Sequence, residues 1–386
     1  MKNRRAAFVL SFAGLAIVAC QVVAGIEPVE KRDPSAAQEG GSSGGEGGSS
    51  GSSDPCGHVQ PPELPEKDDA PEDEEPPFFL ALRTIKLIPE PTDVYQGYDL
   101  DNVCPCDRRK GTAFEGASSC KGVTADDCDR DGGIDNSAVG LFQTFAPTGF
   151  SPDKAANQGI VDGRRGLLIR VAKYNGKAND RDVIVGAMIS HGILDGRGCE
   201  TTVNPSLDRA PPGWCGGDLW TYPQAFVKPG VTEPISSGSG WVKDGELVYK
   251  SQSSVRMFLA GAVISFNLPI TAGRLSKVEG RWHFEGMLTG RIPVSDLLRA
   301  VGSVETDNQK LCQTAYFSLG VKPELCKRAD IMETDRFDNE DPPQGCNAVS
   351  ASVLFTADEA AVGGERTERD EDTGCEGVDQ TLFQCN

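Results

Sequence analysis

Cysteine constrains this 386-residue chain more than any other residue type. Of its thirteen cysteines, Cys20 stands alone after an apolar run, and the other twelve lie between Cys56 and Cys385. So many cysteines remain paired only in an oxidising compartment, outside the cytoplasm. The twelve therefore predict a head crosslinked by disulfides, which reduce the entropy that long loops lose on folding.

Spacing along the chain favours four local pairs among these cysteines. They are Cys120 with Cys128, Cys199 with Cys215, Cys312 with Cys326, and Cys375 with Cys385. Because pairing depends on Cα separation rather than on distance along the chain, other connectivities stay open. Zinc binding at Cys104-Pro105-Cys106 is a further alternative, but the chain has no CxxC motif and only three histidines.

The N-terminus has the pattern of a secretory signal. Three basic residues within the first five precede an apolar stretch at residues 6–18, which is shorter than a membrane span. The sequence Ile17-Val18-Ala19-Cys20 that follows resembles the bacterial lipobox. The resemblance implies that residues 1–19 are a lipoprotein signal peptide and that Cys20 is the lipid attachment site.

The residue after this cysteine bears on the destination. In Gram-negative lipoproteins an Asp at that position commonly signals retention at the inner membrane, so by resemblance Gln21 implies the outer membrane or the cell surface. Several acyl chains would anchor the protein firmly, because each buried CH₂ contributes about 0.8 kcal/mol. An ordinary secretory signal that happens to carry a cysteine is the alternative.

Residues 20–77 have the composition of a stalk. Between Gly40 and Ser53 every residue is Gly or Ser except Glu46, a composition that forms a flexible coil. Residues 61–77 are rich in Pro, Glu and Asp, which extend the chain through fixed φ angles and repulsion between carboxylates. We therefore expect a disordered, lipid-anchored stalk that holds the head away from the membrane.

The net charge of −19 belongs mostly to the appendages of the head. Residues 61–77 hold eight acids and one lysine. Residues 358–386, an acidic tail that contains Cys375 and Cys385, hold nine acids and two arginines. The head itself is close to neutral, which disfavours nucleic acid as a partner because a phosphate backbone requires a concentrated basic surface.

Residues 78–357 have the pattern of a mainly β head. Strand-like runs occur at 78–88, 167–174, 182–189, 246–249, 255–268, 281–288 and 349–355. Asn175-Gly176 is typical of a hairpin turn between the second and third of these runs. Short helices are expected at 294–301, from Thr306 to Leu319, and from Pro323 onward. Many short strands with long connections predict a disulfide-stapled two-sheet β-sandwich with a few short helices.

Alternating carboxylates at residues 127–135 predict a cation site. Asp127, Asp129 and Asp131 occupy relative positions 1, 3 and 5, Gly132 turns the chain, and Asp135 follows at position 9. Calcium prefers six to eight oxygen ligands in such a loop. The stretch resembles the calcium loop of thrombospondin type 3 repeats, although position 12 is Ala138. We expect calcium in a structural role; an Asp/Gly-rich surface turn is the alternative.

A second group of candidate residues is aromatic. Trp214, Trp220 and Tyr222 lie in a Gly/Pro-rich segment beside Cys215. Flat rings near polar groups stack on sugars in many β-sandwich modules, so these residues are candidates for stacking on a carbohydrate ligand. The alternative is that the rings anchor an irregular loop to the core.

Motifs for catalysis are few. Glu279 and Glu285 lie six residues apart, which on an extended strand separates them by about 20 Å, whereas a glycosidase needs carboxyl groups about 5–10 Å apart. The chain has no HExxH and no P-loop, and GxSxG occurs only within the Gly/Ser segment, which is not a nucleophile elbow. A Ser-His-Asp site assembled from distant segments stays open.

Together these features predict an outer-membrane lipoprotein that presents a calcium-stabilised β-sandwich as a binding or structural module. The arrangement is similar to uncharacterised cysteine-rich surface lipoproteins of Gram-negative bacteria, and that resemblance implies no particular site. The expected partners are the membrane, through the lipid anchor, and a carbohydrate or an envelope protein. The alternative is a secreted, glycan-directed hydrolase, which the lack of catalytic motifs disfavours.

Overall fold

The computed structural model describes most of the head and the end of the predicted stalk. The described residues are 57–70, 75–90, 92–94, 96–103, 119–120, 129, 132–145, 151–194, 199, 211–259, 262–306, 309–338, 344–365, 375 and 377–385. The predicted signal peptide, Cys20 and the Gly/Ser segment lie outside them. Within the described residues, no helix is both long and apolar enough to cross a membrane.

The protein is mainly β, as predicted. The strands are β1 (Phe78–Lys86), β2 (Gly166–Ala172), β3 (Asp180–Ser190), β4 (Leu219–Tyr222), β5 (Gly238–Lys243), β6 (Glu246–Lys250), β7 (Val255–Leu259), β8 (Ala262–Val278), β9 (Arg281–Pro293), β10 (Glu305–Thr306), β11 (Gln309–Lys310) and β12 (Ala348–Glu365). The run expected as one strand at 255–268 is therefore the hairpin β7–β8.

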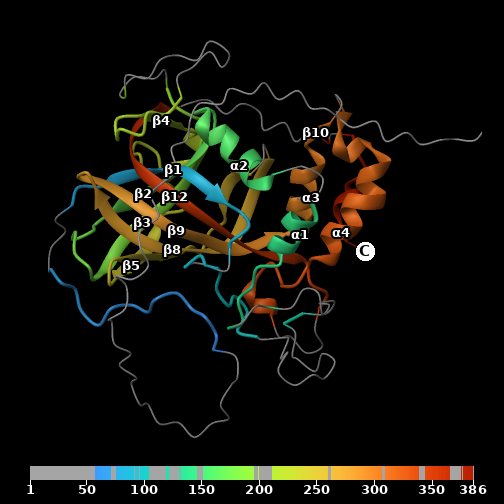
Figure 1. Ribbon diagram of the computed structural model, residues 1–386, viewed down its shortest axis with the longest axis horizontal. Coiled ribbons are helices and arrows are strands. Elements are labelled where there is room, and N and C mark those ends of the chain that lie inside the picture. Colours follow the sequence, from blue (N-terminus) through green and yellow to red (C-terminus); the bar gives the residue numbers. More distant parts are fainter. Residues whose placement is uncertain are drawn as a thin grey trace, which may run out of the picture. The chain divides into compact units, whose positions relative to one another are not determined.

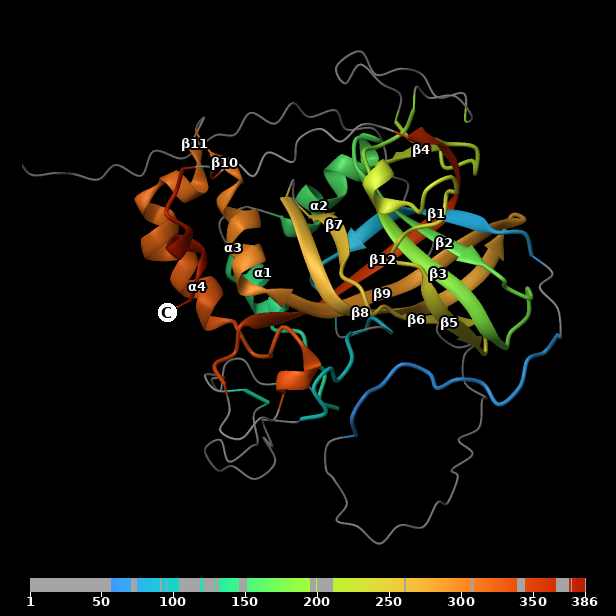
Figure 2. The same cartoon turned by 180° about the vertical axis from the view of Figure 1, so that it is seen from behind.

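Eight strands form one closed antiparallel sheet. Their order is β1-β2-β3-β5-β6-β8-β9-β12, and β12 pairs with β1 again, so that no edge remains between the first and the last strand. β4 joins β12 as a parallel neighbour, and β7 pairs with β8 (Figures 1 and 2). The strands thus form a single sheet that curves onto itself rather than the two facing sheets of the predicted sandwich.

Two tight turns set the register of neighbouring strands. Asp244-Gly245 joins β5 to β6, Glu279-Gly280 joins β8 to β9, and all four residues have φ angles between 52° and 83°. Two consecutive positive φ angles define a type I′ turn, whose twist matches that of the strands it connects. The second position is glycine in both turns, and glycine adopts this conformation without steric cost.

Side chains fill the interior of the closed sheet. Leu80, Val171, Val185, Leu247 and Phe284 come from five different strands, and each is at most 1% exposed. Burial of one such side chain contributes about 1.5–3 kcal/mol. Since the interior is a packed core, the polar sites described below lie on the outer face of the sheet and in the segments that cover it.

Helices cover part of this core. They are α1 (Ala138–Phe145), α2 (Pro152–Val161), α3 (Val294–Gly302) and α4 (Lys322–Lys327), with 3₁₀ turns at Gln224–Phe226, Leu311–Gln313, Asp335–Phe337 and Gln380–Phe383 and a π-helical turn at Phe317–Val321. α3 and α4 pack against each other at one end of the sheet (Figures 1 and 2). α3 follows Pro293 and buries Leu297 and Leu298, which confirms the helix predicted there.

Two expectations for the second half of the chain are wrong. No continuous helix runs from Thr306 to Leu319, because Thr306 pairs with Gln309 in the small hairpin β10–β11. β12 also continues to Glu365, past residue 357, where the head was expected to end and the acidic tail to begin. The first residues of the predicted tail are thus part of the sheet.

Four disulfides join the described cysteines. They are Cys120–Cys346, Cys199–Cys215, Cys312–Cys375 and Cys326–Cys385. Only Cys199–Cys215 matches a predicted pair, and Cys128 lies outside the described residues. Cys312 and Cys326 each bond to the C-terminal segment instead of to each other, so this segment is fastened to the α3–α4 end of the head.

Replacing both Cys326 and Cys385 by Ala should lower the free energy of unfolding by about 4 kcal/mol, because the bond closes a loop with a sequence separation of 59 residues. Replacing both Cys199 and Cys215 by Ala should lower the free energy of unfolding by about 3 kcal/mol, because these residues are only 16 apart in sequence. Denaturant unfolding of the two double variants measures both values. A larger loss for the shorter loop would contradict the assignment of the stabilisation to loop closure.

Candidate metal centre

Buried carboxylates gather beside the loop that was predicted to bind calcium. One carboxylate oxygen from each of Asp99, Asp101 and Asp135 lies within 4.8 Å of the other two, and all three residues are buried. Of the predicted ligands, Asp129 and Asp135 are described, whereas Asp127 and Asp131 lie outside the described residues. The structure therefore brings Asp135 together with two acids that the loop pattern did not include.

Backbone hydrogen bonds place these carboxylates. The amide of Asp135 donates to the carbonyl of Tyr98 at 3.1 Å, and the amide of Leu100 donates to Asp135 Oδ2 at 2.6 Å. The turn at residues 99–102 is stabilised by a side chain within it, because Asp99 Oδ1 accepts a hydrogen bond from the amide of Asn102 at 2.7 Å. Residues 96–103 thus form one wall of a small carboxylate cluster, and Asp135 belongs to the opposite wall.

Two further acids face this cluster. Asp129 Oδ2 is buried and has no hydrogen-bond partner among the described residues. The carboxylate of Asp330 is held by the amide and hydroxyl of Ser350, at 2.8 and 2.5 Å, and its charge acts on Asp129 and Asp135. We call Asp99, Asp101, Asp129, Asp135 and Asp330 the carboxylate cluster.

Burial and mutual repulsion raise the pKa values of three carboxylates in the cluster. Burial, followed by the charges of Asp101 and Asp330, raises the pKa of Asp129 to about 9. Burial and the charges of Asp101 and Asp129 raise the pKa of Asp135 well above its usual range. Burial also raises the pKa of Asp101 to about 6. A carboxylate with a raised pKa is stabilised by a proton or by a cation.

The guanidinium of Arg291, close to Leu100, does not relieve this repulsion. Arg291 is 2% exposed and makes a bidentate pair with Asp338, with Nη–Oδ distances of 3.0 and 2.6 Å. Its Nη2 also donates to the carbonyl of Leu100 at 2.6 Å. The positive charge of Arg291 is therefore committed to Asp338, although the side chain supports the wall that carries Asp99 and Asp101.

The end of the predicted stalk lies against the same cluster. The amide of Val59 donates to the carbonyl of Gly132 at 2.8 Å, and the amide of Asp99 donates to the carbonyl of Val59 at 2.9 Å. His58 Nδ1 is bonded to Asp99 Oδ2, and the Gln60 amide group donates to the carbonyl of Asp99 at 2.8 Å. Residues 57–70, which we call the strap, are thus ordered on the head, in contrast to the disorder expected for this part of the stalk.

The strap continues over the sheet beyond the cluster. Trp241 Nε1 donates to the carbonyl of Pro62 at 3.0 Å, and the amide of Arg181 donates to Asp68 Oδ1 at 2.6 Å. Glu75 rejoins the head just before β1, where its amide donates to the carbonyl of Tyr174 at 3.1 Å. The acidic residues of this segment are therefore not only solvated, because some of them contact the connection between β2 and β3 and the start of β3.

Gly132 has a second reason to be glycine besides the turn. Its φ angle is 86°, and a Cβ at this position would lie 2.5 Å from Val59 Cγ2. Any larger residue would therefore strain the loop and displace the strap. The predicted loop glycine thus links the loop of Asp129 and Asp135 to the N-terminal segment.

The aromatic candidates are separated by their burial. Trp220 is fully buried, so its ring cannot stack on a ligand, and this part of the prediction is wrong. Trp214 packs against Trp220 with a centroid distance of 5.8 Å, and the guanidinium of Arg83 lies 5.6 Å from its ring centroid. Tyr222 lines a pocket together with Arg170 and Gln224.

The candidate acids Glu279 and Glu285 do not form a pair. Glu279 lies in the β8–β9 turn and bonds to Arg281, with Nη2 at 3.2 Å from Oε2. Glu285 lies on β9 opposite Arg274 of β8. The two acids are therefore in different environments, and this geometry gives no support for a glycosidase.

A different polar row crosses the outer face of the sheet. His283 Nδ1 lies 2.6 Å from Asp358 Oδ1, and in register Ser276 is opposite His283 on the neighbouring strand. The Asp358 carboxylate also pairs with Arg83 at 2.5 Å. Ser276, however, makes no hydrogen bond with His283 among the described residues. The row is therefore an ion-pair network with a serine beside it rather than an assembled Ser-His-Asp site.

Comparisons with protein-family models, with curated proteins and with solved structures find no match. The interpretation of the carboxylate cluster consequently depends on its own geometry.

Replacing Asp358 by Asn should reduce the free energy of unfolding by about 1–2 kcal/mol near neutral pH. Burial raises the pKa of Asp358, but the hydrogen bonds from His283 and Arg83 outweigh this and keep the pKa below its ordinary value of 3.8. Stability from this group is present above that ordinary pKa and is lost as the pH falls through the lower, folded-state pKa. The wild type and the variant should therefore converge in acid, as measured by denaturant unfolding at a series of pH values.

Asp182→Asn is a matched control, because Asp182 pairs with Lys173 at 3.3 Å but is largely exposed. It should change stability by less than about 1 kcal/mol at any pH. A constant difference between wild type and Asp358→Asn down to strong acid would show that the carboxylate charge contributes nothing.

Proposed function

We propose that this protein is a lipid-anchored envelope protein whose head binds a calcium ion at the carboxylate cluster. The observation that carries the proposal is the mutual approach of Asp99, Asp101 and Asp135, whose oxygens lie within 4.8 Å of one another in a buried setting. The unpartnered Oδ2 of Asp129 supports it, because a buried carboxylate oxygen without a donor is costly. Calcium accepts such a set of oxygens, with the remaining positions filled by backbone carbonyls or water.

The role proposed for the ion is structural. It joins three pieces of chain that are distant in sequence: residues 96–103, the loop of Asp129 and Asp135, and the segment around Asp330. The strap depends on it indirectly, because Val59 is bonded to both Gly132 and Asp99. In an extracytoplasmic compartment with millimolar calcium, even a site of modest affinity would be saturated.

The anchored state is supported by the sequence at Cys20. The lipobox-like segment and the twelve remaining cysteines both favour an extracytoplasmic location, and Gln21 favours the outer membrane. The four disulfides of the described residues agree with an oxidising compartment. The head then acts as a binding or structural module that the lipid holds at the membrane.

Replacing Asp101 by Asn should have opposite effects with and without calcium. In chelator the variant should melt at a higher temperature than the wild type, because one of several repelling charges is gone while the acceptor for the amide of Val103 remains. In calcium the variant should melt at a lower temperature, because a ligand is lost. For the wild type, calcium at 100 times its Kd should add about 2.7 kcal/mol, or about 5 °C in melting temperature.

Asp182→Asn is the control for this experiment as well, and it should leave the calcium-dependent shift unchanged. Trypsin cleavage after Lys67 in the strap gives an independent readout, since chelation should accelerate cleavage in the wild type. If Asp101→Asn lowered the melting temperature equally in calcium and in chelator, the carboxylate would be a structural group only and the proposed ion would be refuted.

Cys20→Ala should release the protein from the membrane fraction, because no thiol would remain for acylation at the lipobox. Intact-mass analysis of the wild type, extracted from membranes, should show the mass of residues 20–386 plus acyl chains. A wild-type mass equal to an unmodified mature chain would contradict the anchor without affecting the proposed calcium site.

A further inference from the structure

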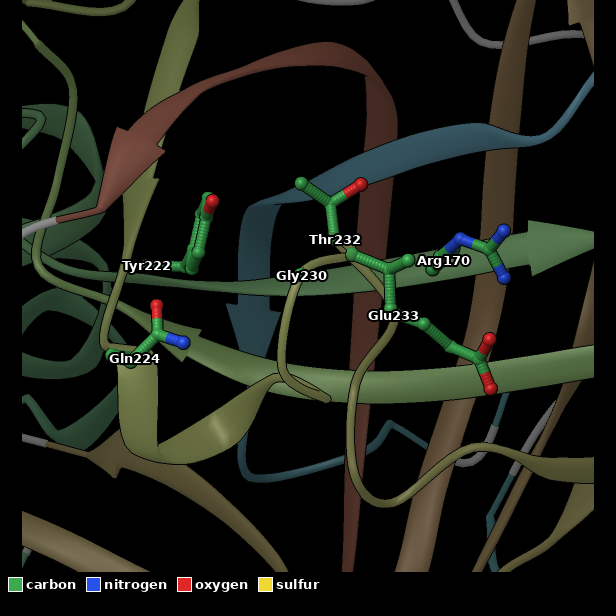
Figure 3. Close-up of a pocket in the computed structure, with 7 residues that line it drawn as sticks. Arg170, Tyr222, Gln224, Gly230, Thr232 and Glu233 are labelled. Carbon is green, nitrogen blue, oxygen red and sulfur yellow. The ribbon is translucent and has the colours of Figure 1, made fainter.

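A second concave site lies on the outer face of the sheet and shares no residue with the carboxylate cluster. It is an open pocket of about 520 Å³ between the end of β4 and the turn at residues 228–233, and Arg170 of β2 forms part of its lining (Figure 3). This volume is typical of sites for small ligands. The pocket is built by the segment that follows the predicted aromatic group, and Tyr222 is the member of that group that reaches it.

The two cations at the pocket differ in how closely they are paired with its carboxylate, Glu233. Glu233 is paired with Lys228, and the backbone of these two residues is also joined, with the amide of Lys228 at 2.8 Å from the carbonyl of Glu233. Arg170, in contrast, makes no hydrogen bond or ion pair with any described residue. Its guanidinium offers a fork of donors that matches a carboxylate in bidentate geometry. The pocket is therefore suited to an anionic group beside Arg170.

The neighbouring polar groups indicate what the rest of the ligand resembles. In Figure 3 the Tyr222 ring is seen nearly edge-on at one side of the pocket, the Arg170 guanidinium lies at the other side, and Thr232 lies between them. Gln224 lies next to Tyr222 and adds an amide (Figure 3). The hydroxyl of Tyr222 and the side chains of Gln224 and Thr232 make no hydrogen bonds with described residues. A ligand with several hydroxyl groups and a face that stacks on an aromatic ring would satisfy all of them.

These features together favour one chemical class. A phosphate dianion is disfavoured, because Arg170 is the one cation among the described lining residues and its charge already interacts with the carboxylate of Glu233. A carboxylate carries one charge and takes the guanidinium fork in its plane. A sugar ring supplies both the stacking face and the hydroxyl groups. We propose that this pocket binds a uronic acid unit of an acidic polysaccharide, with its carboxylate on Arg170 and its ring on Tyr222.

The test uses the full-length mature protein and trimers of galacturonate, glucuronate and mannuronate, each compared with its neutral methyl ester by isothermal titration calorimetry. At least one acid trimer should bind at least tenfold more tightly than its ester. Arg170→Gln should weaken binding of that acid about tenfold and remove the preference over the ester. Tyr222→Leu should weaken acid and ester by similar factors, because stacking does not depend on the carboxylate.

Arg274→Gln is the matched control, since Arg274 is an exposed arginine of β8 on the same sheet and outside the pocket. It should bind like the wild type, and melting temperatures of all variants establish that they are folded. Three outcomes overturn the proposal: no uronate binds, acid and ester bind equally to the wild type, or Arg170→Gln and Arg274→Gln weaken binding by the same factor. None of these outcomes depends on the calcium site.

Discussion

Buried negative charge is the constraint on which one whole side of this protein depends. Asp99, Asp101 and Asp135 lie within reach of one ion, and the charges of Asp129 and Asp330 act on the same place. An isolated ionised carboxylate cannot be buried without a large cost, so the group must take up a proton or a cation. Several segments meet there: the strap is bonded to Gly132 and Asp99 through Val59, and Cys120 of the Cys120–Cys346 disulfide contacts the carbonyl of Asp330.

The local elements of the fold could be predicted from sequence, and the closed sheet could not. Alternating or continuous apolar runs at β1, β2 and β3 are local signals, and the structure confirms them. Closure depends on the pairing of β1 with β12. These strands are more than 260 residues apart, and neither contains a sequence pattern that indicates which strand it pairs with. Three of the four predicted disulfide pairings are wrong for the same reason. Cys312 is closer in sequence to Cys326 than to Cys375, but the fold brings Cys375 to it.

The residues of the candidate site show the same difference between local signals and contacts made only by the fold. The Asp/Gly pattern includes Asp135, which the structure places beside Asp99 and Asp101, because a loop motif is contiguous in sequence. Asp99 and Asp101 were missed, since they reach Asp135 only through the backbone pairing of residues 98–100 with residue 135. Their spacing by two residues is the one signal that would have marked them. Trp220 shows the opposite error, because composition cannot distinguish an aromatic residue in a ligand site from one that fastens a loop to the core.

The contrast between Arg291 and the carboxylate cluster explains why a diffusible ion suits this fold. Arg291 and Asp338 neutralise each other permanently, with side chains that are 2% and 6% exposed. A second arginine at the cluster would give the same permanent result. With the proposed calcium ion, the neutralisation, and with it the attachment of the strap through Val59, instead depends on the surrounding medium. A protein exported unfolded into a calcium-rich compartment would then complete this side of its structure only after arrival.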